Sequence, residues 1–157
     1  MNKALVLALF LPEAALADCA EGTFLSCTIK GKALDVCVAG DRVTYAFGPA
    51  GVPELELSEP LSALTHSPWS GVGRSIWEGL GFRNEGYTYE AYLSFDRLNQ
   101  AAGMEGGVTV LKGEKIVTQL ACDAGTVEGH FDTLTEAMAG QGYCWNPADF
   151  RYQQGGC

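Results

Sequence analysis

The stretch that decides the fold is residues 69–97, WSGVGRSIWEGLGFRNEGYTYEAYLSFDR, which holds two of the three Trp and three of the six Tyr of the 157-residue chain. Aromatic and branched residues alternate with polar residues on both sides of residues 83–86, RNEG. A period of two is typical of strands with one buried face, and a short Gly-containing segment between two such runs is typical of a hairpin. The sequence therefore predicts a long hairpin at the centre of an all-β domain.

The alternation assigns the side chains of this hairpin to two faces. In the second arm the core face carries Tyr87, Tyr89, Ala91, Leu93 and Phe95. In the first arm the same face carries Ile76, Leu80 and Phe82, with Glu78 as the exception to the apolar pattern. A carboxylate on a core face needs either solvent at the mouth of a barrel or a local bulge. Glu78 is therefore a candidate functional residue.

The remaining strands are expected on both sides of the central hairpin. Alternating patterns and turn residues predict strands at 23–29, 33–38, 42–47, 54–57, 108–111 and 115–121. Residues 59–70 and 98–107 are interpreted as loops, with a possible helical turn at 99–104. Residues 132–140 have a helical pattern, and the tail from Tyr143 is expected to be a stapled coil. The predicted fold is an antiparallel sandwich or small barrel of about eight strands, with one short C-terminal helix and stapling disulfides.

The first 17 residues have the features of a secretory signal. Lys3 supplies a positive start, residues 4–11 form an apolar core, and residues 15–17, ALA, form a small-residue cleavage site. We therefore expect a signal peptide at 1–17, a single β domain at 18–157, and a periplasmic or secreted location. The alternative is a lipoprotein box at residues 16–19, in which Cys19 is acylated.

All six Cys lie beyond that cleavage site, at positions 19, 27, 37, 122, 144 and 157. An even number of Cys in an exported chain favours disulfides over metal ligation. The predicted hairpin over 24–38 turns at 30–32 and places Cys27 opposite Cys37, so we predict a bridge between these two residues. The other four Cys are expected to staple the termini to the sheet, with a free Cys157 as the alternative.

The formal charge of −9 limits the classes of partner. Nucleic-acid binding needs clustered Lys and Arg, and the sequence has no such cluster. An acidic surface steers basic partners toward it. The alternative interpretation is that acidity only keeps an exported protein soluble.

Residues that could support catalysis are few. The two His, His66 and His130, are predicted in a Ser/Pro-rich loop and before the helix, away from any nucleophile motif. Glu78 and Glu90 could face one another across the hairpin as an acid/base pair, although two solvated glutamates are the simpler interpretation. The sequence offers no metal-ligand motif, and we expect no cofactor.

The entry to the central hairpin is the best candidate for a binding site. Gly71 and Gly73 allow a tight backbone, Ser70 offers a hydroxyl, and Arg74 offers a rigid charged fork beside the large contact area of Trp69. The predicted binding residues are Trp69, Ser70, Gly71, Gly73, Arg74 and Glu78. The alternative is that this segment only connects two strands, with its Trp in the core.

Several of these segments resemble small exported bacterial proteins of the lysozyme-inhibitor group, especially inhibitors of invertebrate-type lysozyme. The likeness runs through FLSC, GKALDVCVAGDRVTYAFG, PELEL, SGVGRSI, GYTYEAYLS and GGVTVLKGEKIVTQLAC. Those inhibitors insert a loop with a pattern like SGxxY into the lysozyme cleft. Ser70 and Gly71 match its first two positions, and Arg74 stands near the place of the Tyr. The resemblance implies an inhibitor of a basic lysozyme-type cell-wall hydrolase. The alternatives are a glycan or small-ligand binding module using Trp69, Trp77 and Tyr92, and a small enzyme using Glu78 and Glu90.

Overall fold

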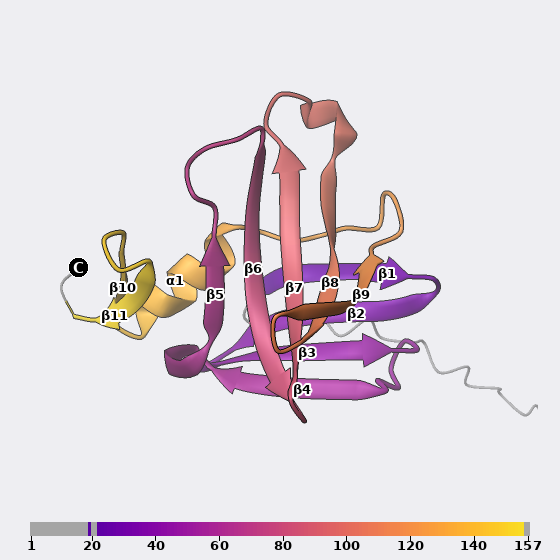
Figure 1. The fold of residues 1–157 in the computed structure, drawn as a ribbon, viewed down its shortest axis with the longest axis horizontal. Helices are drawn as coiled ribbons and strands as arrows, with labels where there is room; N and C mark the ends of the chain where they lie inside the picture. The colour runs from indigo at the N-terminus through magenta and orange to yellow at the C-terminus, as the bar shows by residue number, and fades with distance from the viewer. Residues whose placement is uncertain (1–18, 20–21, 156–157) are drawn as a thin grey trace, which may run out of the picture.

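The computed structural model describes residue 19 and residues 22–155, and these form an antiparallel β-sandwich with one α-helix (Figure 1). The first sheet is a meander of four strands in the order β1-β2-β3-β4. Its strands are β1 (Thr23–Ile29), β2 (Lys32–Ala39), β3 (Arg42–Gly48) and β4 (Leu55–Pro60). The alternation of apolar and polar residues in these segments therefore predicted the first sheet correctly.

The second sheet is a meander of five strands in the order β5-β6-β7-β8-β9. The central hairpin consists of β6 (Ser75–Asn84) and β7 (Tyr87–Asp96), and Asn84 pairs with Tyr87 across a two-residue turn. Both turn residues have positive φ, 50° at Glu85 and 81° at Gly86, as the tightest hairpin turns require. The other strands are β5 (Thr65–Pro68), β8 (Met104–Lys112) and β9 (Lys115–Ala121). The predicted central hairpin is confirmed.

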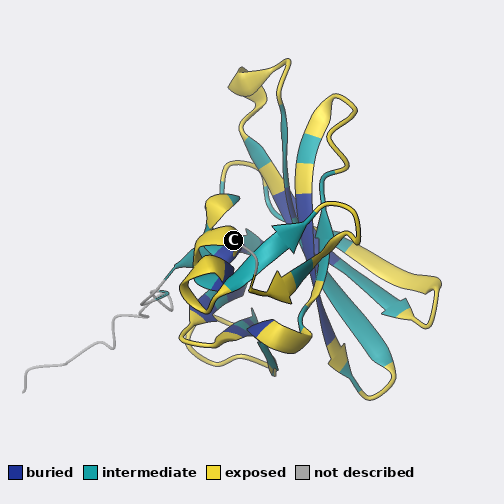
Figure 2. Cartoon of the chain, turned by 90° about the vertical axis from the view of Figure 1, so that its left-hand side faces the viewer, coloured by how far each residue is buried: buried dark blue, intermediate teal, exposed yellow. Residues whose placement is uncertain are grey.

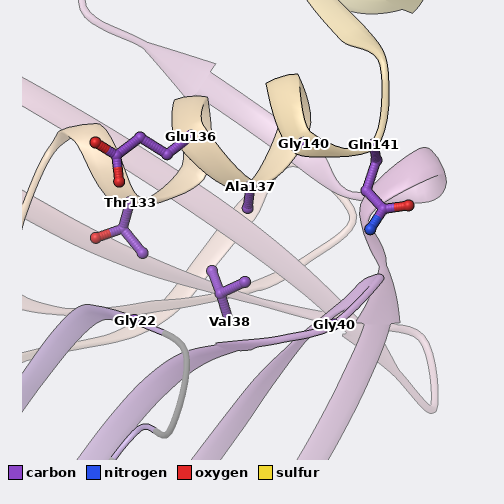
Figure 3. Close-up of a pocket in the computed structure, with 8 residues that line it drawn as sticks. All are labelled: Gly22, Val38, Gly40, Thr133, Glu136, Ala137, Gly140 and Gln141. Carbon is purple, nitrogen blue, oxygen red and sulfur yellow. The ribbon is translucent and has the colours of Figure 1, made fainter.

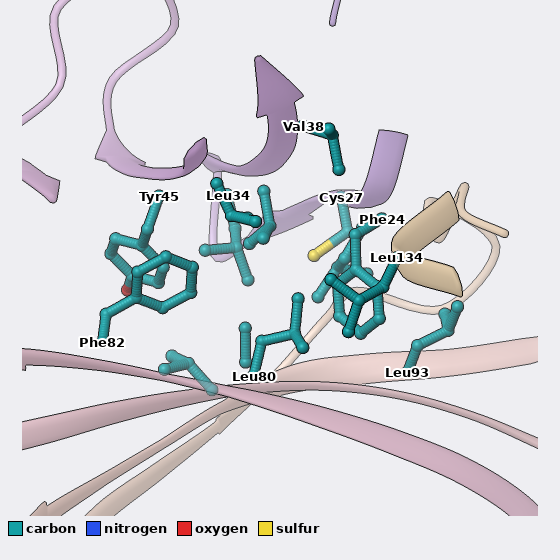
Figure 4. Close-up of a cluster of buried hydrophobic side chains, with 14 of the residues drawn as sticks. Phe24, Cys27, Leu34, Val38, Tyr45, Leu80, Phe82, Leu93 and Leu134 are labelled. Carbon is teal, nitrogen blue, oxygen red and sulfur yellow. The ribbon is translucent and has the colours of Figure 1, made fainter. Parts of the chain in front are cut away.

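The core lies between the two sheets, whose strands run across one another in Figure 1. Figure 4 shows Leu34 and Tyr45 of the first sheet facing Leu80 and Phe82 of the second. The fully buried side chains include Phe24, Leu25, Leu34, Val36, Val43, Tyr45, Leu80, Phe82, Leu93 and Leu134. Each apolar side chain of this size contributes roughly 1.5–3 kcal/mol when it is fully removed from water. Figure 2 shows this buried centre with exposed strand ends and loops around it.

The C-terminal region covers one end of the sandwich. The helix α1 (Asp132–Gly140) has the predicted bounds and buries Leu134 and Met138. The tail was predicted to be coil, and this is wrong: β10 (Tyr143–Asn146) and β11 (Arg151–Gln154) form a separate two-stranded sheet. Their aromatic residues pack against β5, which explains why this short hairpin is ordered.

Two predicted loops also contain regular structure. Within 59–70 the chain forms a 3₁₀ turn, η1 (Leu61–Ala63), and then β5, which is an edge strand paired only with β6. An edge position tolerates Pro68, which has no N–H to donate. Within 98–107 the helical turn is η2 (Gln100–Ala102), and β8 begins at Met104. The prediction of about eight strands missed β5 and the tail hairpin; the described residues contain eleven strands.

The predicted Cys27–Cys37 bridge is wrong. The tight turn at Lys30 and Gly31 pairs Cys27 with Leu34, and a register shift pairs Cys37 with Thr23. Because Cys37 is three residues from Leu34, the two Cys lie on opposite faces of the hairpin. The disulfides are Cys27–Cys122 and Cys19–Cys37, and Cys144 is also disulfide-bonded.

Other expectations concern the two ends of the chain: the lipoprotein alternative, the signal segment and Cys157. The sulfur of Cys19, which an acyl chain would occupy in the lipoprotein alternative, is bonded to Cys37. The expected signal segment, residues 1–17, and the C-terminal Cys157 lie outside the described residues. In the part of the chain that is described, no helix has the length and apolar character needed to cross a membrane.

Candidate functional site

The 69–74 loop joins β5 to β6 and projects from one end of the second sheet (Figure 1). Residues 70–74 are all exposed, and Val72 is 72% accessible. Gly71 and Gly73 have φ angles of 85° and 99°, in the region that favours glycine. The alternative in which Trp69 belongs to the core is wrong, because Trp69 is only partly buried beside this loop.

Internal contacts hold the 69–74 loop in shape. The Trp69 indole Nε1–H donates a hydrogen bond to the carbonyl oxygen of Val72 at 2.7 Å and closes the loop. The Arg97 guanidinium lies over the Trp69 ring, 5.6 Å from its centroid. Such a cation–π contact contributes about 0.5–1 kcal/mol at an exposed site. The exposed loop is therefore anchored through one large side chain.

A second anchor lies at the other end of the loop. Arg74 Nε donates to Asp96 Oδ2 at 2.6 Å, and Arg74 Nη2 contacts the same oxygen. The Arg74 hydrogen bond lowers the pKa of Asp96, and Asp96 in turn raises the pKa of Arg74. The Arg97 N–H also donates to the Arg74 carbonyl oxygen at 3.2 Å. Part of the Arg74 fork thus braces the loop, while the remaining guanidinium donors face solvent on a side chain that is 64% accessible.

Glu78 lies inside the protein, on the inner face of β6 where the alternation placed it. Only 9% of its side chain is accessible, and its Oε1 lies 2.7 Å from Nε2 of His66, whose side chain is 8% accessible. The sequence placed His66 in a loop, and this is wrong: His66 is on β5, where it pairs with Leu80, two residues along the strands from the Pro68–Glu78 pair and on the same face. Neither solvent nor a bulge is needed at Glu78, because an imidazole satisfies the carboxylate.

Aromatic residues of the C-terminal hairpin enclose His66. The ring centroids of Trp145 and Tyr152 lie 5.3 Å and 5.4 Å from that of His66. The Tyr152 hydroxyl lies 3.0 Å from Thr135 Oγ1, and burial raises the Tyr152 pKa. His66 Nδ1 is buried without a hydrogen-bond partner among the described residues. A base must reach the proton that it abstracts, so this enclosed nitrogen is poorly placed for catalysis.

A cavity of about 310 Å³ lies between the 69–74 loop and the C-terminal hairpin. We call it the aromatic cavity; its walls are His66, Pro68, Trp69, Ile76, Trp77, Glu78, Phe131, Thr135, Trp145 and Tyr152. Trp69 at the start of the loop lines the cavity, as do Ile76 and Trp77 of β6, the strand that follows the loop. The structure therefore brings two of the predicted binding residues, Trp69 and Glu78, to one site, with Ser70, Gly71, Gly73 and Arg74 on the exposed segment beside it.

The predicted carboxylate pair does not form. Glu78 is opposite Leu93 across the central hairpin, whereas Glu90 is opposite Gly81. Since Leu93 and Glu90 are three residues apart on β7, their side chains lie on opposite faces of the sheet. Glu78 and Glu90 cannot act on one substrate atom, and the acid/base interpretation of this pair is wrong.

Another hollow, of about 470 Å³, lies between α1 and the end of β2 (Figure 3). Its walls are glycines and short side chains, with Glu136 from the helix and Gln141 directly after it. Figure 3 shows the Glu136 carboxylate turned away from Val38. No polar residue of its wall is buried, so this hollow lacks the convergent polar groups typical of a ligand site.

Comparison of the chain with known protein families, with curated proteins and with solved structures found no match. Among residue 19 and residues 22–155, no three His, Cys, Asp or Glu side chains come together as metal ligands. Function is therefore inferred from the geometry of the 69–74 loop and its surroundings.

Proposed function

We propose that the protein is an exported binding protein that inserts its 69–74 loop into the cleft of a basic partner, and that this partner is a lysozyme-type cell-wall hydrolase. The observation that carries the proposal is the combination of full exposure and internal bracing in this loop. Val72 projects at 72% accessibility while its carbonyl oxygen is held by Trp69. A loop that only connects two strands does not need both exposure and internal bracing.

Bracing matters because binding orders flexible segments at a cost in free energy. Each rotamer-rich side chain that is immobilised costs about 0.5–1.5 kcal/mol, and a loop already held in its bound shape avoids part of that cost. Here the Trp69 hydrogen bond and the Arg74–Asp96 ion pair act at the two ends of the loop. The glycines between them present backbone N–H groups without side chains that would obstruct a narrow cleft.

Charge supports the choice of partner. A lysozyme cleft holds two carboxylic groups that flank the scissile glycosidic bond, on an enzyme that is usually basic. The protein's formal charge of −9 steers such a partner toward it. Once the loop is in the cleft, the Ser70 hydroxyl, the loop N–H groups and the free Arg74 donors can hydrogen-bond to the catalytic carboxylates.

Export is part of the same proposal. Disulfides form and persist in oxidising compartments, and the bridges Cys19–Cys37 and Cys27–Cys122 are compatible with a non-cytoplasmic protein. The signal at 1–17 is the proposed route. The mass of the protein recovered from the exported fraction tests it: removal of residues 1–17 is expected, and retention of those residues contradicts the proposed cleavage.

The direct test is cell-wall lysis by invertebrate-, chicken- and goose-type lysozymes in the presence of micromolar purified protein. Inhibition of at least one lysozyme is expected, and it should weaken in Val72→Asp, which places a carboxylate at the loop tip. Val52→Asp is the matched control, because Val52 is 70% accessible on another loop and the change in charge is the same. Unchanged lysis with all three enzymes would refute the lysozyme proposal, and equal effects of the two variants would refute the role of the loop.

A further inference from the structure

The outer face of the second sheet carries a hollow that is separate from the 69–74 loop. On β6 the residues on this face include Ser75, Trp77, Gly79 and Gly81, since Glu78, Leu80 and Phe82 point to the core. Gly79 pairs with Tyr92 on β7, and Tyr92 pairs with Gly107 on β8. Across the three strands, the large side chain of Tyr92 thus lies between two glycines, which have no side chain.

The neighbouring side chains lie flat over these glycines. A Cβ built on Gly107 would be 2.8 Å from the Tyr92 hydroxyl oxygen, and a Cβ on Gly79 would be 2.9 Å from Glu90 Oε1. Tyr92 and Glu90 therefore fold across adjacent strands instead of standing out from the sheet. They leave a shallow hollow of about 370 Å³, with Trp77 in its wall.

The chemistry of this wall is specific. Trp77 is 38% accessible and offers an apolar indole surface. Around it are hydroxyl and amide groups from Ser75, Ser94, Thr109 and Gln119, which both donate and accept hydrogen bonds. Glu90 is the one charged residue of the wall, and no Lys or Arg takes part. Anionic ligands such as phosphates, sulfates and uronates would meet a carboxylate with no compensating cation.

We propose that this hollow binds a neutral oligosaccharide. A pyranose ring has an apolar face of C–H groups, which packs on an indole, and a rim of hydroxyls, which need a series of small donors and acceptors. The wall supplies both in one place, and the Glu90 carboxylate adds an acceptor for a bidentate hydroxyl pair. The shallow form suits a chain of sugars that continues beyond the hollow.

The test is calorimetric titration of the disulfide-bonded protein with hexamers of β-1,4-linked glucose and of β-1,4-linked N-acetylglucosamine, and with hexagalacturonate as the anionic counterpart. We expect at least one neutral hexamer to bind, and hexagalacturonate to bind at least about tenfold more weakly. Trp77→Ala should weaken binding about tenfold or more, because it removes the indole surface. Phe150→Ala, which removes another exposed aromatic residue at 59% accessibility, should have no effect.

A second variant separates this site from the aromatic cavity, which Trp77 also borders. Gly79 is not in the wall of that cavity, and a methyl group in Gly79→Ala would displace the end of the flexible Glu90 side chain, which is part of the wall of the hollow. We expect loss of sugar binding with a nearly unchanged melting temperature and unchanged lysozyme inhibition. The proposal is overturned if no neutral hexamer binds at millimolar concentration, or if Trp77→Ala and Gly79→Ala bind as the unaltered protein does.

Discussion

The Glu78 carboxylate shows how one residue can satisfy two opposed requirements. Its place in the alternation of β6 turns it into the sandwich, where an unpaired charge would be very costly. His66 on the adjacent edge strand supplies a hydrogen bond at 2.7 Å, and Trp145 and Tyr152 cover the imidazole. The pair thus joins β5, β6 and the C-terminal hairpin around one buried contact.

We expect His66→Phe to lower the free energy of unfolding by about 3 kcal/mol, because it keeps a ring but leaves the buried carboxylate without its partner. The double variant His66→Phe/Glu78→Leu should recover at least half of that loss, since both polar groups are then removed. Urea unfolding of His66→Phe, of Glu78→Leu and of the double variant measures both effects. A loss below about 0.5 kcal/mol in His66→Phe would contradict the buried pairing of His66 with Glu78, because so small a contribution is typical of exposed ion pairs.

Sequence reasoning at the residue scale located Glu78 correctly but not its partner. The period of two is a local property, so it could turn Glu78 inward. The partner depends on which strand lies next to β6. Residues 65–68, THSP, have too low a β propensity to predict a strand. A chemical argument points toward the partner. A carboxylate predicted on a core face requires a hydrogen-bond donor, and the chain has only two His.

The order of the 69–74 loop should depend on pH through the Arg74–Asp96 ion pair. Because Arg74 lowers the pKa of Asp96, the ion pair is complete above the ordinary Asp value of about 3.9. Its contribution to loop order is lost as the pH falls through the lower pKa of the folded state. We expect the NMR order parameters of the backbone in residues 70–74 to fall there relative to those of β7.

Asp96→Asn supplies the control for that pH dependence. This variant should show lower order parameters in residues 70–74 at neutral pH, and little further change on acidification. NMR relaxation of the backbone amides, with β7 as the internal reference, measures both. A loop with the same order parameters in the variant and the unaltered protein would contradict bracing by the ion pair.

Elements with strong local signals were predicted well, and elements that depend on distant partners were not. The hairpin β6–β7 has ten-residue arms and a turn with Gly86, and α1 has apolar residues four apart with a Gly stop. In contrast, β10 and β11 have four residues each and gain their order from contacts with His66 and α1. Such contacts are set by tertiary packing, which a single sequence does not display.

On the scale of the whole molecule, the Cys27–Cys122 bridge links the first strand of one sheet to the residue that follows the last strand of the other. Its sequence separation is 95 residues, against 18 for Cys19–Cys37. In the chain-entropy account, closing a loop near 100 residues stabilises by about 4.7 kcal/mol, and a loop near 15 residues by about 3 kcal/mol. The sequence led to the prediction of the short-range bridge Cys27–Cys37, because a local pattern indicates strand register only within one hairpin.

We therefore expect Cys27→Ala/Cys122→Ala to lower the free energy of unfolding by about 1–2 kcal/mol more than Cys19→Ala/Cys37→Ala. Denaturant unfolding of the two double variants measures the difference. Disulfide mapping by mass spectrometry after proteolysis is the control, and it should recover the Cys19–Cys37 and Cys27–Cys122 pairs from the unaltered protein. A peptide that links Cys27 to Cys37 would contradict the structure.

Binding of a cell-wall hydrolase through the 69–74 loop is tested most directly by amide exchange of the protein with and without a saturating amount of the lysozyme that it inhibits best. The loop amides are exposed in the free protein, so insertion into a cleft must protect them from exchange. We predict that protection is concentrated in residues 70–74, with β8 and β9 unchanged. Protection elsewhere without any in residues 70–74, or none at all under saturating conditions, would contradict the proposed function.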